Sequence, residues 1–235
     1  MTVYSFHPEL ILGYVQSILS AMSMTVYLLV YSLLIGLAIG VLLTCVQVRG
    51  SRLAATIAHG YISFMRGVPS LVMILMLFMG LPQVMHSFGV DMSSVAKSTY
   101  IVVALSLLSS ANLGEMMRSS YLAIDHGQTE AALSVGMTER QALGRIVLPQ
   151  AVAVAVPNFG NSVIGLFKET SLAFSIGTLD LMGKAQAVMQ VNYGSTRLEV
   201  YLAIAIIYWI CCLALQLVFA GIERATTRGR AMATS

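Results

Sequence analysis

Lys168 and Glu169 are neighbouring residues of opposite charge in a strongly apolar part of the chain. Ionisable residues in such a segment are energetically costly and usually face a cavity or a partner. The Lys168 ammonium could hold a carboxylate and the Glu169 carboxylate could hold an ammonium group, so the two together suit a zwitterionic solute. The alternative is an internal ion pair at the end of a helix. Since adjacent residues point in different directions on a helix, one of the two could face a pathway while the other does not.

Further polar residues precede this pair in the same apolar segment, close to Pro157 and Gly160. A proline and a glycine free backbone groups there and favour a bent helix that lines a cavity. Elsewhere, Arg66 is either a cation that faces a pore or fixes the helix bundle, or a side chain that snorkels from the end of a kinked span. Glu115 either pairs with Arg118 three residues later or makes a gating contact. The candidate residues of a solute pathway are therefore Arg66, Glu115, Asn158, Asn161, Ser162, Lys168, Glu169, Thr170 and Ser171.

The sequence has no motif that would make this chain an enzyme. It contains no G-x4-G-K-[ST] phosphate-binding loop, because Gly183-Lys184 lacks both the upstream glycine and the following hydroxyl residue. The histidines are scattered and form no H-E-x-x-H motif, so we expect no metal site. An intramembrane enzyme would require a paired acid and base or a set of metal ligands in the spans, and none is present. We therefore expect no catalytic residue and no metal ligand.

The composition points to a membrane protein. The 235 residues are 57% hydrophobic and 10% charged, whereas soluble domains contain about 25% charged residues. A soluble fold of this length could not cover its surface with so few charges. Runs of about 20 apolar residues predict transmembrane helices, and we expect an all-α integral membrane protein with five of them in a single domain, residues 1–235. The expected spans cover about residues 18–46, 53–81, 98–117, 146–167 and 200–222.

Two of these spans carry local signals for packing or bending. Arg66-Gly67-Val68-Pro69 interrupts the second span, which is therefore predicted to be kinked or preceded by an elbow. In the first span, Gly36 and Gly40 are four residues apart, a spacing that permits close contact between helices.

The placement of positive charge predicts the orientation in the membrane. Cytoplasmic loops carry an excess of lysine and arginine. Eight cations flank one side, namely Arg49, Arg52, Arg118, Arg140, Arg145, Arg224, Arg228 and Arg230, and three flank the other, namely Lys97, Lys184 and Arg197. We therefore expect the N-terminus outside, the C-terminus in the cytoplasm, and the polar insert at residues 125–149 on the cytoplasmic side.

This insert has the local signals of two short helices that meet at an elbow. Asp125 with Gln128 three residues later resembles a capping box, and so does Thr138 with Gln141. Gly136 lies between the two helical stretches and can adopt the left-handed conformation that closes a helix. The sequence therefore predicts a compact, structured loop between the third and fourth spans.

The surface of the insert favours a protein partner. Ala131, Ala132 and Val135 are expected to give the first short helix a small apolar face, which lets the groove of another protein approach the backbone closely. Glu130 and a Glu139-Arg140 pair would rim this contact. The alternative is an amphipathic hairpin on the lipid surface, but such a helix would carry more lysine and bulkier apolar residues.

The spacing E-A-A-x3-G-x9-I-x-L-P runs from Glu130 to Pro149. It resembles the cytoplasmic coupling loop of the permease subunits of binding-protein-dependent ABC importers. Further matches lie at Tyr61-x4-Arg66-Gly67-x-Pro69, Gly127-Gln128, Pro149-Gln150-Ala151 and Lys168-Glu169-Thr170-Ser171-Leu172. Together these motifs resemble the polar amino-acid branch, which imports histidine, glutamine, arginine, cystine or opines, and in which aspartate is commoner at the Glu169 position. The resemblance extends from about Ser20 to the end of the last span.

The resemblance implies a five-helix permease that pairs with a second permease, identical or homologous, and with two copies of an ABC ATPase subunit. ATP and magnesium would bind to the ATPase, so this chain itself would need no cofactor. An extracytoplasmic solute-binding protein would deliver the amino-acid substrate, and the chain would lie in the lipid bilayer of a prokaryotic plasma membrane, with no nucleic acid as partner. Closure of the ATPase subunits would drag the third and fourth spans and switch access. The coupling residues would be Asp125, Gly127, Gln128, Glu130, Ala131, Ala132, Gly136, Thr138, Ile146, Leu148 and Pro149.

Within this branch the resemblance favours cystine or another sulfur-containing amino acid. It is carried by residues around Gly183, Ala185 and Gln186 and by Leu198-Glu199-Val200 at the entry to the last span. The alternatives are a permease for another small polar solute and a membrane scaffold subunit that does not transport. A scaffold would not need the polar residues in the fourth span.

Overall fold

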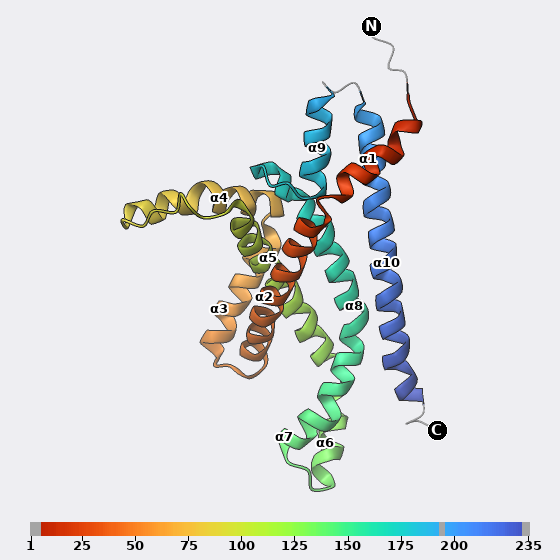
Figure 1. The fold of residues 1–235 in the computed structure, drawn as a ribbon. Coiled ribbons are helices and arrows are strands. Elements are labelled where there is room, and N and C mark those ends of the chain that lie inside the picture. Colours follow the sequence, from red (N-terminus) through yellow and green to blue (C-terminus); the bar gives the residue numbers. More distant parts are fainter. Residues whose placement is uncertain (1–5, 193–195, 232–235) are drawn as a thin grey trace. The chain divides into compact units, whose positions relative to one another are not determined.

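The computed structural model of the chain describes residues 6–192 and 196–231, with side chains up to Thr226, and these residues are organised as helices joined by short turns (Figure 1). The side chains of Arg228 and Arg230, which entered the prediction of orientation, therefore lie outside the described residues. The α-helices are α1 (Glu9–Leu19), α2 (Met22–Arg49), α3 (Arg52–Gly67), α4 (Ser70–Ser87), α5 (Lys97–Leu122), α6 (His126–Ser134), α7 (Glu139–Ala142), α8 (Leu148–Glu169), α9 (Leu181–Val191) and α10 (Arg197–Ala231). A π-helical turn (Leu143–Val147) precedes α8 and a 3-10 helix (Thr170–Ile176) follows it.

Five segments of the described chain are long and apolar enough to cross a membrane, which confirms the predicted number. They are Met22–Arg49, Ser70–Ser87, Lys97–Leu122, Glu139–Ile176 and Arg197–Thr226. The all-α membrane fold is therefore correct, although several predicted bounds are not. The first span begins at Met22 rather than near residue 18. The third span, α5, and the fifth span, α10, extend beyond their predicted limits.

The second predicted span, 53–81, is two helices rather than one. α3 ends at Gly67 and α4 begins at Ser70, with Pro69 in an extended conformation (ψ 137°) at the N-terminus of α4. The proline ring disfavours helical backbone at Val68, so the helix cannot run through this point. Of these two helices, only α4 is long and apolar enough to be a membrane span. The elbow predicted at this position is confirmed.

The described chain forms two compact units. Unit 1 comprises residues 1–35, 68–108 and 165–213, and unit 2 comprises residues 36–67, 109–164 and 214–235. Unit 1 contains α1, which the composition did not indicate because eleven residues are too few for a span. α1 packs on α9, and the Tyr14 hydroxyl accepts a hydrogen bond from Asn192 Nδ2 (3.2 Å) and donates one to Thr196 Oγ1 (3.0 Å).

In unit 2, small residues let α2 and α5 approach closely. A Cβ atom on Gly40 would lie only 3.2 Å from the backbone nitrogen of Gly114, so the two helices meet backbone to backbone. Thr44 strengthens this contact, because its hydroxyl donates to the Gly114 carbonyl at 3.0 Å. The close contact predicted from the glycine spacing is therefore confirmed at Gly40.

In unit 1, a buried carboxylate holds the start of α9. Asp180 is fully buried, and its carboxylate accepts hydrogen bonds from the backbone N–H groups of Gly183 (2.9 Å) and Met182 (3.3 Å). The N–H of Leu181 donates to the Thr25 hydroxyl at 3.1 Å, which ties α9 to α2. Burial outweighs these hydrogen bonds and raises the pKa of Asp180 to about 6.

The shifted pKa of Asp180 predicts a pH-dependent stability. Because the folded state holds this proton more tightly than the unfolded chain does, the free energy of unfolding should fall as pH rises from about 4 to about 6, by at most about 3 kcal/mol, and then level off. Asp180→Asn keeps an oxygen acceptor without the charge and should lack this fall. We therefore expect the melting temperature of Asp180→Asn, relative to the unsubstituted protein, to rise over this pH range.

Asp91→Asn is the matched control for this experiment. Asp91 is exposed, and the backbone N–H of Ser93 lowers its pKa, so its small contribution has the opposite sign. Melting curves of purified protein at several pH values between 4 and 7 measure the difference. Parallel curves for Asp180→Asn and the unsubstituted chain would contradict a proton held by Asp180.

Candidate functional site

The insert between α5 and α8 starts with a helix cap. Asp125 is the N-cap of α6, and its carboxylate accepts from the backbone N–H of Gly127 at 2.8 Å. This cap satisfies one of the free N–H groups at the start of the helix. The predicted partner of Asp125, Gln128, has another contact: its side-chain oxygen accepts from Gln150 Nε2 at 3.2 Å. Gln150 therefore joins α6 to the start of α8.

Gly136 forms the elbow of the insert, as predicted. Its φ is +85°, a conformation that other residues rarely adopt. The N–H of Gly136 donates to Leu133 O (3.0 Å) and that of Met137 donates to Ala132 O (3.1 Å). This is the hydrogen-bond pattern of a Schellman motif, in which a left-handed glycine closes a helix. The direction in which the chain leaves α6 is therefore set by this one residue.

The second half of the insert begins with a capped α-helical turn and continues as a wider π-helical turn. Thr138 and Gln141 form the predicted capping box, with Thr138 N–H to Gln141 Oε1 at 2.9 Å and Gln141 N–H to Thr138 Oγ1 at 3.3 Å. The regular helix expected to continue from here is replaced by the π-helical turn Leu143–Val147. Pro149, with no N–H, cannot supply the usual bond to the carbonyl four residues earlier, and the local backbone departs from the α-helix.

The exposed surface of the insert differs from the expected one. Ala132 is buried against α7 and the π-helical turn, whereas Ala131 and Val135 are exposed, so the three do not form one face. Ala131 and Ala132 point about 100° apart on the helix, and Val135 is the C-cap residue, where the regular helical backbone ends. Val135 is 79% exposed and Leu133 41% exposed. The apolar surface that the elbow offers is therefore made of these larger side chains.

Charged and half-exposed residues surround this apolar tip. Glu130, Glu139 and Arg140 are exposed, as predicted for the rim. Figure 1 shows α6 and α7 side by side at the end of α8. Of the remaining residues assigned to the insert, Gly127, Gln128, Thr138, Leu148 and Pro149 are exposed and Ile146 is half-buried. The Ile146 carbonyl accepts from Gln150 Nε2 at 3.0 Å, which braces the π-helical turn.

Unit 2 also contains five of the pathway candidates. Glu115 forms the helical ion pair with Arg118, at 2.6 Å and 3.0 Å, rather than pointing out alone. Arg66 is exposed in the last turn of α3. The Tyr61 hydroxyl, at the start of the Tyr61-x4-Arg66 motif, lies 2.8 Å from Ser110 Oγ on α5.

The polar stretch in the middle of α8 has mixed exposure. Asn158 and Asn161 are exposed, and Ser162 Oγ donates to the Asn158 carbonyl at 2.9 Å. Residues three and four apart lie on one face of a helix, so all three side chains share a face. The hydroxyl of Ser162 is used within the helix, and the two amides remain the groups that could meet a solute.

Unit 1 holds the other candidates. The internal ion pair between Lys168 and Glu169, which was the alternative to solute binding, does not form within this described part of the chain. Lys168 is exposed, whereas Glu169 is half-buried with its carboxyl near the Ser70 hydroxyl. Adjacent positions on a helix point in different directions, which separates the two charges. The Thr170 hydroxyl is buried and donates to Phe167 O, and that of Ser171 donates to Lys168 O, both at 2.7 Å. These two hydroxyls therefore satisfy carbonyl groups in the last turn of α8.

Sequence reasoning missed two contributors to this region. Ser70 begins α4, and only its position directly after Pro69 marked it as the start of a helix. Asp180 was marked by the pattern of an acidic residue immediately before an apolar run, which is typical of an N-cap. In both cases the local sequence indicated the helix start but not the distant residue that the side chain meets.

The five apolar spans and the capped elbow define a polytopic α-helical membrane protein. Residues 32–228 match the family model described as "Binding-protein-dependent transport system inner membrane component". The chain belongs to this family, and it is the permease subunit of an amino-acid ABC importer.

Relatives of this chain are amino-acid permeases. The chain is 36% identical to the L-cystine transport system permease protein TcyL of Bacillus subtilis over 220 residues, 94% of this chain and 91% of TcyL. It is 38% identical over 193 residues to the probable amino-acid ABC transporter permease protein PatM of Vibrio harveyi, 82% of this chain and 83% of PatM. A solved structure of an amino acid ABC transporter with histidines superposes with a TM-score of 0.83 at 30% identity, covering 94% of this chain and 99% of the other.

Proposed function

We propose that this chain lines half of an ATP-driven import pathway for cystine or another sulfur-containing amino acid. It would lie in the plasma membrane of a prokaryote with the N-terminus outside and the C-terminus in the cytoplasm. A second permease, identical or homologous, would line the other half, an extracytoplasmic binding protein would deliver the substrate, and two ATPase subunits would bind ATP and magnesium.

The geometry of the elbow supports the proposed docking of an ATPase subunit. Val135 and Leu133 together expose apolar surface at the tip of the elbow, and exposed apolar patches mark interaction sites. The caps at Asp125, Gly136 and Thr138 make this element rigid. A rigid tip that plugs into an ATPase groove would transmit its motion to α5 and α8, to which the insert is joined at either end.

The solute would meet polar groups on α8 and at its end. Lys168 and Glu169 point in different directions without neutralising each other, which leaves one ammonium and one carboxylate for a zwitterion. Asn158 and Asn161 offer amide groups further along the helix. The similarity to TcyL, and at 34% identity to the cystine permease TcyB of the same organism, supports cystine as the substrate.

Uptake of isotope-labelled cystine by cells that lack only this chain tests the proposal. We expect uptake to be lost, because removing the chain removes half of the pathway, and to return when the chain is restored from a plasmid. Labelled arginine, histidine and glutamine serve as parallel substrates. Unchanged cystine uptake with loss of one of these would assign a different amino acid, and unchanged uptake of all four would overturn the proposed transport.

A further inference from the structure

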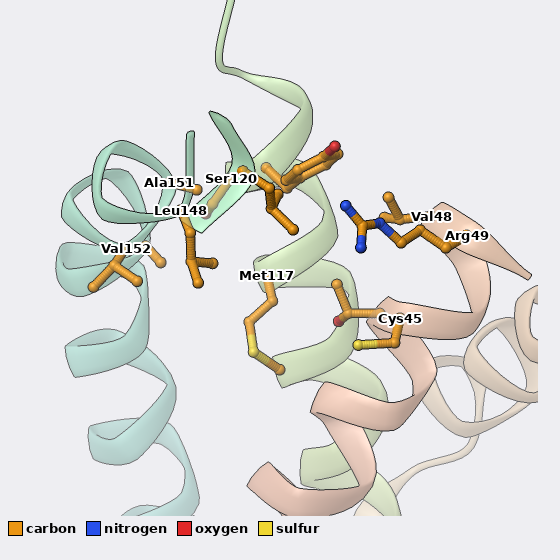
Figure 2. A pocket seen from close by; sticks show the side chains of 12 residues that line it. Cys45, Val48, Arg49, Met117, Ser120, Leu148, Ala151 and Val152 are labelled. Carbon is orange, nitrogen blue, oxygen red and sulfur yellow. The ribbon is translucent and has the colours of Figure 1, made fainter. Parts of the chain in front are cut away.

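Unit 2 contains an apolar pocket that the transport proposal does not use. Its volume is about 220 Å³, and it lies between the ends of α2 and α5 and the start of α8 (Figure 2). An apolar cavity of about 150 Å³ is already large enough to bind a benzene-sized molecule and stays free of water. This pocket is larger and opens at the protein surface, so it can accept a longer apolar group.

Two of the polar side chains that line the pocket, Thr44 and Ser120, are already used within the protein. Thr44 Oγ1 donates to the carbonyls of Gly40 and Gly114, and Ser120 Oγ donates to that of Met116 at 2.8 Å. Apart from Tyr121 and Arg49, the remaining wall is made of Cys45, Met117, Leu148 and other largely apolar side chains. A polar solute would gain few hydrogen bonds here and would lose its hydration, so the lining selects an apolar ligand.

One charge accompanies this apolar wall. Arg49 is an exposed residue that lines the pocket, and Figure 2 shows its guanidinium reaching from α2 toward α5. It is the last residue of α2, and therefore lies at the end of a membrane span, at the depth of lipid head groups. Arginine forms paired hydrogen bonds with phosphate, and basic pockets between membrane helices bind anionic lipid head groups.

We propose that this pocket binds an anionic phospholipid, with one acyl chain against Met117 and Leu148 and the phosphate on Arg49. The two features are complementary to the two halves of such a lipid. Inorganic phosphate would leave the apolar cavity empty, and an uncharged apolar molecule would leave the guanidinium without a partner. The ligand would also contact Leu143, the first residue of the π-helical turn within the insert.

Lipid retention measured by native mass spectrometry tests the head-group contact. The full chain, purified with the subunits that accompany it, is placed in nanodiscs with equal amounts of phosphatidylglycerol and phosphatidylcholine. We expect retained phosphatidylglycerol to exceed phosphatidylcholine by about fivefold, the preference worth one arginine at a membrane surface. Arg49→Gln should remove this preference, while Arg224→Gln, at an exposed arginine of α10 that does not line the pocket, should keep it.

Alkylation of Cys45 tests the acyl-chain contact without changing the fold. Cys45 is exposed and lines the pocket, and Figure 2 shows its sulfur directed toward Met117. In a chain with Cys211 and Cys212 replaced by alanine, N-ethylmaleimide on Cys45 should fill the pocket and reduce retained lipid by about fivefold. The same treatment of a Cys45→Ala variant should have no effect.

Each result decides the proposal. Retention that is unchanged by alkylation of Cys45 would place the acyl chain elsewhere, and a lipid preference that survives Arg49→Gln would place the phosphate elsewhere; either result overturns the site. Displacement of the lipid by inorganic phosphate alone would show that the pocket holds a free anion instead. None of these results depends on which amino acid is transported.

Discussion

Replacing Gly136 by valine should reduce substrate uptake by about five- to thirtyfold, the equivalent of the strain of about 1–2 kcal/mol that a left-handed residue carries. Gly136 has a φ of +85°, and a Cβ there meets nothing within 4 Å, so the damage is conformational rather than a clash. A β-branched residue is a particularly poor fit to this backbone. The elbow would open, and Val135 would no longer be presented to a partner.

Aspartate and asparagine at the same position separate conformation from charge. Both tolerate the left-handed region better than valine, and they are nearly the same size. Gly136→Asn should therefore retain most uptake, whereas Gly136→Asp places a third negative charge beside the exposed Glu130 and Glu139 and should lose docking or coupling. Gly136→Asp, which keeps the elbow but changes its surface charge, therefore tests the contact between the elbow and the ATPase separately from the backbone conformation.

Co-purification and uptake are both measured for these variants. A membrane-inserted Gly136→Asp chain that no longer brings down an ATPase subunit would show that the elbow is the docking element. If the ATPase still co-purifies but ATP hydrolysis continues without uptake, the elbow is needed for coupling rather than docking. Normal docking and normal uptake in both Gly136→Val and Gly136→Asp would refute the proposal that the elbow transmits the motion of the ATPase to α5 and α8. Gly144→Ala, at an exposed position with free space around it, is the neutral control.

The elbow was predictable because its determinants are local. A capping box joins residues three positions apart, and a left-handed glycine closes the helix immediately before it, so Thr138, Gln141 and Gly136 could be assigned from spacing alone. The membrane spans were predictable for a similar reason, since each requires only a run of apolar residues. Even the break between α3 and α4 is a local consequence of Pro69.

Features that depend on distant neighbours were not predictable. Ala131 and Ala132 look alike in the sequence, yet only Ala132 is buried, because α7 and the π-helical turn fold back onto that side of α6. α1 has too few residues for a span, and its position on α9 depends on Tyr14 reaching the far end of the chain. The proximity of Ser70 to Glu169 likewise depends on how α4 returns to the end of α8.

Glu169→Gln should reduce uptake by about tenfold to a hundredfold, the equivalent of one charge-assisted hydrogen bond to a substrate ammonium of about 1.5–3 kcal/mol. The carboxyl group is half-buried, so water screens its charge only in part. The chain should still insert and assemble, because glutamine has the same shape and can still contact Ser70. Glu169→Asp, which preserves the charge, should retain more uptake than Glu169→Gln.

Two comparisons distinguish substrate binding from packing at Glu169. Ser70→Ala removes the hydroxyl near the carboxyl without removing the charge, so it should have a much smaller effect on uptake if Glu169 acts on the substrate. Glu9→Gln, at an exposed carboxylate paired with His7, is the control for general loss of negative charge. The measurement is the concentration dependence of uptake, and loss of a binding contact should raise KM more than it lowers the maximal rate. If Ser70→Ala and Glu169→Gln are equally impaired with unchanged KM, Glu169 holds α4 against the end of α8 and does not touch the solute.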